Sequence, residues 1–355
     1  MRIRGAHVAR VRVITTAFGM SQRSGCCHGS LRFRLARSLR LAALTGLALT
    51  PPALSMESLV SAEQELARMM AATTLSYRGT ATYEQAGALT TLRLVRWVRD
   101  GRVWERLEYL DGPPGEIIRE DGRWGCAEPG SPEAVADRAL AVGRTAMVEH
   151  YLAGFLDDAR VAGRPVVRIR LQPRDQYRYG HVLGIDRQTG VLMQALTLDQ
   201  QGRLLERFQF ADIAIGASTE DADLEPRSTG RRSLPGSVCD PGAAPSRAPG
   251  WRATWVPPGF VVLPARPTAG EAEMMHFTDG FSSFSVFVDA DSATPPVHEA
   301  RRGPTAAYLR RHQDAEGAHW ICVVGEVPMP TARRIAEGVE PHRGESAPDR
   351  AAGQP

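Results

Sequence analysis

Lysine is absent from this 355-residue chain, whose 43 basic residues are all arginine. The abundance of alanine, glycine and proline beside them indicates a compositional bias of the coding DNA, so no function follows from it. Cysteine is scarce, with five residues and no CxxC spacing for metal or redox chemistry. For the three beyond residue 55, Cys126, Cys239 and Cys322, buried free thiols are favoured over a disulfide with one thiol left over.

Long apolar runs are also missing beyond residue 55, and a membrane-spanning helix needs about 20 apolar residues. The shorter apolar stretch 41–49 follows arginines at positions 32, 34, 37 and 40 and precedes the small residues Ala53 and Ser55. This order is typical of a secretory signal peptide, whereas a basic tail with a buried helix would not require it. We predict a leader over residues 1–55 that is cleaved after Ser55, with Met20 as an alternative start of the chain. The exported protein is therefore expected in the periplasm.

Acidic residues are absent from the predicted leader, which carries nine arginines. The formal net charge of +3 for the whole chain therefore becomes −6 beyond residue 55, where 34 basic residues face 40 acidic ones. The basic excess belongs to the leader and not to a domain surface, which excludes nucleic acid as a partner.

Catalytic motifs are missing too, including the GxSxG elbow, the HExxH helix and phosphate-binding glycine loops. Glu105 and Glu108 are three apart on a predicted strand and would point to opposite faces, so we interpret them as solvated charges. His312 and His319 have a metal-like spacing, but surface histidines are the favoured interpretation. We expect no enzyme, no cofactor and no metal site.

The patterns that are present predict two domains, since about 300 residues exceed one ordinary core. Helical periodicity covers residues 57–74, and alternating strands separated by turns such as Asp100-Gly101 follow. The predicted strands span residues 75–83, 89–98, 103–110, 115–119, 123–126, 161–171, 177–186, 191–198 and 204–215. A covering helix is predicted within 131–157, from Met147, Val148, Tyr151, Leu152 and Phe155 at helical spacing.

The remaining part of the chain reads as a linker and a smaller domain. Residues 217–250 have the proline, glycine and serine content of a linker. Strands at 251–263, 276–289 and 319–325 and a helix at 330–339 form the small domain, and residues 341–355 are predicted to be disordered. The expected boundaries are leader 1–55, N-terminal domain 56–216, linker 217–250, C-terminal domain 251–340 and tail 341–355.

The expected fold class is α+β, with a large curved antiparallel sheet covered by helices and a smaller mixed C-terminal domain. A sheet of so many strands must twist and curl into a half-barrel. Aromatic residues including Trp97 and Trp104 lie in it; core positions are favoured, but a cavity between sheet and helices would suit acyl chains. Binding of a lipid or lipoprotein is therefore one functional hypothesis.

Several stretches resemble a known family in order and spacing. The sharpest are Trp255-Val256-Pro257-Pro258-Gly259-Phe260, Thr278-Asp279-Gly280-Phe281-Ser282-Ser283-Phe284, and Val323-Val324-Gly325-Glu326 with Thr331-Ala332-Arg333-Arg334-Ile335-Ala336. Weaker ones are Leu110-Asp111-Gly112-Pro113, Glu128-Pro129-Gly130, Arg160-Val161-Ala162-Gly163-Arg164 and Gly184-Ile185-Asp186. Together they resemble the MucB/RseB family over most of the chain beyond residue 55.

The resemblance implies a lipoprotein-carrier-like N-terminal domain and a periplasmic negative regulator of an envelope-stress sigma factor. Such a regulator binds the periplasmic segment of a single-span membrane anti-sigma factor, shields it from proteolysis, and is released by acyl chains, lipoproteins or lipopolysaccharide. Trp255, Phe281 and Phe284 are the candidate partner contacts, with the core of the small domain as the favoured alternative. Residues 131–156 are shorter than the family pattern, which puts a ligand lid there in doubt.

Two other classes stay open at this point. A lipid or lipoprotein carrier without a regulatory partner would account for the first domain and leave the second without a use. An envelope hydrolase would need a nucleophile that the sequence does not display. A homo-oligomer is also left open.

Overall fold

The computed structural model describes residues 56–120, 147–218, 223–225, 231–233, 250–263, 273–290, 298–314 and 317–342. The predicted leader, the predicted strand 123–126, the stretch 131–146 and residues 343–355 of the predicted tail lie outside these ranges, whereas Pro341, predicted to begin that tail, ends a strand. No helix within them has the length and apolar character needed to cross a bilayer.

Ten of the described strands form one open sheet in the order β10-β4-β3-β2-β1-β9-β8-β7-β6-β5. The strands are β1 Tyr77–Gln85, β2 Ala88–Arg99, β3 Arg102–Tyr109, β4 Gly115–Glu120, β5 Tyr151–Val161, β6 Arg164–Pro173, β7 Gly180–Asp186, β8 Leu192–Leu198, β9 Leu204–Ile215 and β10 Arg231–Ser233. All neighbours pair antiparallel except β10, which pairs parallel with β4 from within the predicted linker. The predicted large antiparallel sheet is confirmed.

Tight turns explain why neighbouring strands pair in this sheet. Ala86-Gly87, Asp100-Gly101 and Ala162-Gly163 each join two strands by two residues, and all six residues have positive φ. This conformation matches the right-handed twist of a hairpin and is least costly for glycine at the second position. The Asp-Gly signal in the sequence therefore predicted its hairpin correctly.

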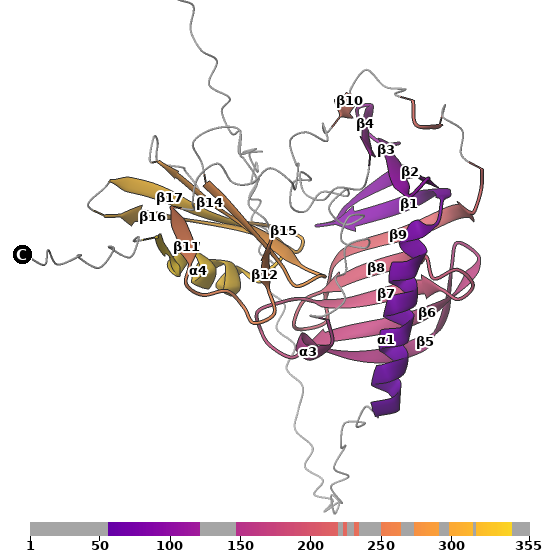
Figure 1. Ribbon diagram of the computed structural model, residues 1–355, viewed down its shortest axis with the longest axis horizontal. Coiled ribbons are helices and arrows are strands. Elements are labelled where there is room, and N and C mark those ends of the chain that lie inside the picture. Colours follow the sequence, from indigo (N-terminus) through magenta and orange to yellow (C-terminus); the bar gives the residue numbers. More distant parts are fainter. Residues whose placement is uncertain are drawn as a thin grey trace, which may run out of the picture. The chain divides into compact units, whose positions relative to one another are not determined.

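Helix α1, Met56–Ala71, lies along one face of the large sheet (Figure 1). Its buried residues Ala62, Leu66 and Met69 follow the i, i+4, i+7 spacing of one helix face and share a core cluster with Ile169 and Ile185 of the sheet. A 3-10 turn at Ala72–Thr74 follows, so the helix predicted at 57–74 is confirmed. One face of the sheet is thereby covered next to strands β5 to β7.

The C-terminal domain contains a second sheet, in the order β12-β13-β14-β17-β16-β15, and a two-stranded pair of β11 and β18. Its elements are β11 Trp251–Ala253, β12 Val261–Leu263, β13 Glu273–Thr278, β14 Ser283–Ala290, β15 Glu299–Arg302, β16 Thr305–Gln313, β17 Ala318–Gly325, α4 Met329–Glu337 and β18 Val339–Pro341. Ala332, Ile335 and Ala336 of α4 are fully buried in the same cluster as Phe284 and Val323. The separate smaller sheet domain confirms the second half of the predicted fold class.

The helix predicted from Met147, Val148, Tyr151, Leu152 and Phe155 is wrong over most of its described length. Only Met147–His150 is helical, as α3, and β5 begins at Tyr151. A spacing of four residues lies on one face of a helix and also on one face of a strand, so the pattern could not separate the two. Tyr151 and Ala153 are buried against the core, which shows the two-residue period of a strand.

Other expectations change in detail. The predicted strands 161–171, 251–263 and 276–289 are each divided by a turn or loop, and β15 and β16 were not predicted. Cys322 is a free thiol, as predicted, and burial raises its pKa to about 11. Cys126 and Cys239 lie outside the described residues.

Glu105 is not the solvated charge that was expected. It is 8% exposed and pairs with Arg96, which also donates to the carbonyl of Thr73 at 2.6 Å. Glu108 is half-buried and pairs with Arg93 at 3.2 Å and with Arg106 at 3.1 Å. The cross-strand register places an arginine opposite each carboxylate, and this arrangement requires long-range pairing that alternation alone does not specify.

Candidate functional site

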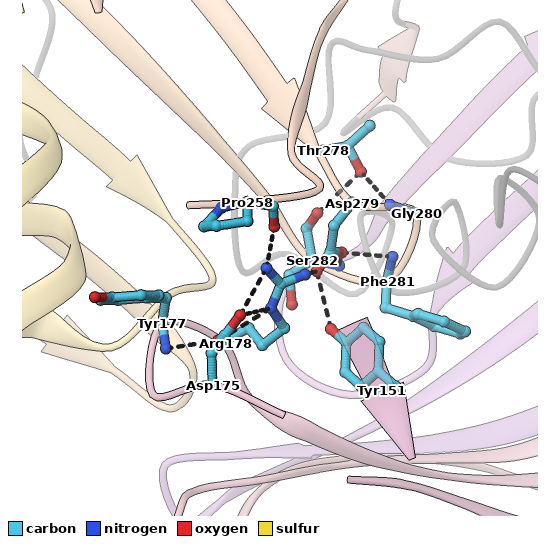
Figure 2. Close-up of polar contacts among 10 residues, drawn as sticks. All are labelled: Tyr151, Asp175, Tyr177, Arg178, Pro258, Thr278, Asp279, Gly280, Phe281 and Ser282. Carbon is cyan, nitrogen blue, oxygen red and sulfur yellow. Dashed lines mark hydrogen bonds and ion pairs between the residues drawn. The ribbon is translucent and has the colours of Figure 1, made fainter. Parts of the chain in front are cut away.

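Arg178 lies in the loop between β6 and β7 and reaches the C-terminal domain (Figure 2). Its Nη1 donates to Asp279 Oδ2 at 2.7 Å, its Nε donates to Asp175 Oδ2 at 3.1 Å, and its Nη2 donates to the carbonyl oxygen of Pro258. The Arg178 and Asp279 side chains are both 0% exposed. A buried charge is tolerated only when it is paired and hydrogen-bonded, and these contacts satisfy that requirement for the guanidinium.

Tyr151, the first residue of β5, provides a second donor to the same carboxylate. Its hydroxyl donates to Asp279 Oδ2 at 2.9 Å, and the Arg178 guanidinium lies 5.6 Å from its ring centroid. Burial, followed by the negative charge of Asp279, raises the pKa of Tyr151 well above its usual value, so the hydroxyl stays protonated and able to donate. Burial lowers the pKa of Arg178, but Asp279, Tyr151 and Asp175 together outweigh that effect and raise it. Arg178 and Tyr151 together form a two-donor receptor for an anion.

Asp279 lies in the turn that joins β13 to β14, which also carries Phe281. Its other oxygen, Oδ1, accepts from the backbone N–H of Phe281 at 3.0 Å and of Ser282 at 2.8 Å. One carboxylate therefore shapes the turn and binds the N-terminal domain at the same time (Figure 2). The sequence distance of 101 residues between Arg178 and Asp279 is spanned only in the folded chain.

Phe281 lies in the hydrophobic core of the N-terminal domain although it belongs to the C-terminal one. It is 5% exposed and shares the cluster of α1 residues Ala62, Leu66 and Met69. Its ring meets Tyr151 edge-on at 5.3 Å and stacks on His181 at 5.6 Å. This predicted partner contact is therefore placed inside the molecule, at the junction of its two domains.

Trp255 lies at the same junction. Its ring meets Tyr177 at 5.2 Å, and the Arg334 guanidinium of α4 lies 3.9 Å from its centroid. Arg334 Nη1 also donates to the hydroxyl of Tyr177 at 2.8 Å. Trp255 thus links the loop that carries Arg178 to the C-terminal helix.

Phe284, the third predicted contact, is 0% exposed and stacks on Phe277 at 4.9 Å inside the small domain. Its position is that of a core residue, which was the alternative interpretation.

Trp97 and Trp104 form a cross-strand pair at the end of the β2–β3 hairpin. Their ring centroids are 5.5 Å apart, and Arg99 and Arg102 each place a guanidinium 5.3 Å from an indole. A cavity of about 510 Å³ is lined by Trp97, Arg99, Asp100, Arg102, Trp104, Leu224 and Glu225. The structure does not bring this pair to the Arg178 cluster by any described contact, so the predicted ligand-lining residues lie apart from the predicted partner contacts Trp255 and Phe281.

His312 and His319 lie directly opposite each other on β16 and β17, each edge-on to Trp251. Among the described residues, no three histidine, cysteine, aspartate or glutamate side chains are grouped to hold a metal ion. The aromatic contact with Trp251 gives both imidazoles a packing role.

Sequence reasoning did not identify Arg178, Tyr151 or Asp175 as site residues; it named Tyr151 only as part of a predicted helix and Asp279 only as part of a family motif. No local pattern distinguishes Arg178 from the other arginines of the chain. The useful signal was the Asp279-Gly280-Phe281 turn, since an aspartate before a glycine commonly shapes a turn with its own carboxylate.

Comparisons with known proteins agree over both domains. The model of the MucB/RseB N-terminal domain matches residues 61–228, and that of the MucB/RseB C-terminal domain matches residues 245–340. The sigma factor AlgU regulatory protein MucB of Pseudomonas aeruginosa is 35% identical over 288 residues, which are 75% of this chain and 86% of the relative. The sigma-E factor regulatory protein RseB of Haemophilus influenzae is 27% identical over 297 residues, 79% of this chain and 91% of the relative.

Solved structures give the same result for the fold. A crystal structure of MucB in complex with MucA(peri) matches with a TM-score of 0.64 at 33% identity, over 79% of this chain and 98% of that one. A structure of MucB alone matches with a TM-score of 0.59 at 32% identity, again over 79% of this chain and 98% of that one. Since the two domain models together match well over half of the chain, this protein belongs to the MucB/RseB family.

Proposed function

We propose that this chain is a periplasmic negative regulator of an envelope-stress sigma factor and binds the periplasmic segment of a membrane anti-sigma factor. The match to MucB bound to MucA(peri) carries the proposal, because it extends through both domains and covers 98% of that chain. A carrier without a partner would have no use for the C-terminal domain that Arg178 and Phe281 tie to the first one. The predicted domain boundaries, with export directed by residues 1–55, are part of this proposal.

The bound regulator shields its partner from the protease that starts signalling, and a lipid or lipoprotein ligand releases it. A ligand can shift this equilibrium only by binding the released state more tightly than the complex. The junction supplies an element that can respond, since its polar contacts join the two domains. The proposed role involves no catalytic step.

The test uses purified residues 56–355 and the periplasmic segment of an anti-sigma factor from the same organism. Calorimetry should show a saturable complex, and the bound segment should be cleaved more slowly by the protease that starts signalling. An unrelated periplasmic segment of equal length and charge is the control. Absence of binding, or binding without protection, would contradict the proposal.

A further inference from the structure

The Asp279–Phe281 turn presents two chemical groups to the N-terminal domain at once. The carboxylate of Asp279 is held by Arg178 and by the Tyr151 hydroxyl, at 2.7 Å and 2.9 Å. The phenyl ring of Phe281 fills a socket beside Tyr151 and His181 in the core under α1. Among the described residues of that cluster, Phe281 is the one contributed by the C-terminal domain. An anion and an apolar group two residues apart are thus bound by adjacent sites.

We infer that this receptor and socket form a binding site for an anionic amphiphile, and that the Asp279–Phe281 turn occupies it as an internal mimic of that ligand. The carboxylate or phosphate of the ligand takes the place of the Asp279 carboxylate, and its apolar chain takes the place of the Phe281 ring. This inference deepens the release step of the proposed function, on which it rests.

The receptor has the properties that such a ligand requires. Arg178 donates to Asp175 of its own loop, and its other two contacts, with Asp279 and Pro258, are the ones that an anionic group of the ligand would replace. Asp175 stays with Arg178 in either state, because both residues lie in the same loop. The socket is apolar, and each methylene group of a chain buried there should strengthen binding about fourfold.

Ligand binding and domain closure are mutually exclusive at this site. Asp279 and Phe281 are joined by the hydrogen bond from the Phe281 N–H to Asp279 Oδ1, so the turn leaves as one piece. Its departure also removes the ion pair that joins the domains, while the desolvation cost of that pair offsets much of its attraction. A ligand of moderate affinity can therefore open the junction.

The test measures binding of dodecanoate to residues 56–355 by calorimetry, below its micelle concentration. Phe281→Ala and Asp279→Asn each remove one half of the mimic and should tighten binding by at least about tenfold, since burial of a phenyl ring or pairing of a charge no longer competes. Phe281→Leu, which keeps the socket filled, should stay close to the wild type. Phe155→Ala is the matched control, because Phe155 is 41% exposed on β5.

Ligand charge provides the second arm. Dodecylamine has the same chain and the opposite charge, so Asp279→Asn should not increase its binding affinity. Equal dodecanoate affinities in Phe281→Ala, Asp279→Asn and Phe155→Ala overturn the inference. A loss of binding that is confined to Trp97→Ala also overturns it, because that result would place the ligand at the pair formed by Trp97 and Trp104. Circular dichroism shows which variants are folded, and Asp279→Asn decides the matter if Phe281→Ala is not folded.

The outcome is independent of the partner assay. Tighter dodecanoate binding without capture of an anti-sigma segment would leave this site standing and refute the proposed function. Capture of the segment, with dodecanoate binding that is unchanged in Phe281→Ala and Asp279→Asn, would support the proposed function and refute this site.

Discussion

Asp186, at the end of β7, is a fully buried carboxylate whose contacts are all local to one turn and one neighbouring strand. Its oxygens accept from Arg164 at 2.7 Å and 3.0 Å and from the N–H and hydroxyl of Thr189 at 2.8 Å and 2.7 Å. Burial by itself would raise its pKa, but the hydrogen bonds from Arg164 and Thr189 outweigh burial and lower it. The ionised form is therefore the one that the fold stabilises.

The sign of the pH dependence follows from this lowered pKa. The stability that ionised Asp186 contributes is fully present at pH values above its pKa in the unfolded state, about 3.9. It is lost as the pH falls through the lower pKa of the folded state. In thermal unfolding between pH 2.5 and 7, the advantage of the wild type over Asp186→Asn should be constant above about pH 5 and shrink toward acid. Asp212→Asn, at an exposed site on β9, is the matched control. A constant difference between wild type and Asp186→Asn down to pH 2.5 would contradict this.

At the scale of elements, the loop between β11 and β12 is held against α3 by a close approach. Gly259 has φ of +83°, and a Cβ placed there would lie 2.0 Å from the imidazole ring of His150. The preceding residue, Pro258, accepts from Arg178. Only a residue without a side chain allows the loop to reach the Arg178 guanidinium while α3 stays in place.

Gly259→Ala should therefore lower the free energy of unfolding by more than the cost of placing alanine at a positive φ. Gly202→Ala is the matched control, because Gly202 has φ of +77° and a Cβ there would meet nothing within 4 Å. We expect about 1 kcal/mol for Gly202→Ala and a further 1–3 kcal/mol for Gly259→Ala, measured by urea unfolding. Equal costs would show that His150 moves aside freely.

At the scale of the whole molecule, the two domains are joined by a buried ion pair. Removing one member of such a pair leaves an uncompensated charge and costs about 3–5 kcal/mol, whereas removing both charges is nearly neutral. Asp279→Asn keeps an acceptor for the Phe281 and Ser282 N–H groups. It therefore removes the charge of the side chain while the turn keeps its structure.

Arg178→Met should consequently uncouple the domains, and calorimetry should show the C-terminal domain unfolding in a separate, earlier transition. The double variant Arg178→Met/Asp279→Asn should return most of the lost stability, to within about 1 kcal/mol of the wild type. A double variant as unstable as Arg178→Met would mean that hydrogen bonding, and not charge balance, holds the junction.

The sequence predicted most of the fold because its signals are local. Asp100-Gly101 specifies a tight hairpin through the positive φ of both residues, and Leu66 and Met69 specify a buried helix face through their spacing. The same reasoning failed at Tyr151 and Phe155, because a spacing of four residues fits a helix and a strand alike.

By itself the sequence determined the two-sheet architecture, the acidic charge beyond residue 55 and membership of the family. Only the tertiary structure decided that Phe281 fills the core of the other domain and that Arg178 and Tyr151 share the carboxylate of Asp279. Turn and helix preferences depend on neighbouring residues, whereas a buried ion pair depends on burial and geometry that exist only after distant segments have met. The candidate site therefore became visible only at the junction of the two domains.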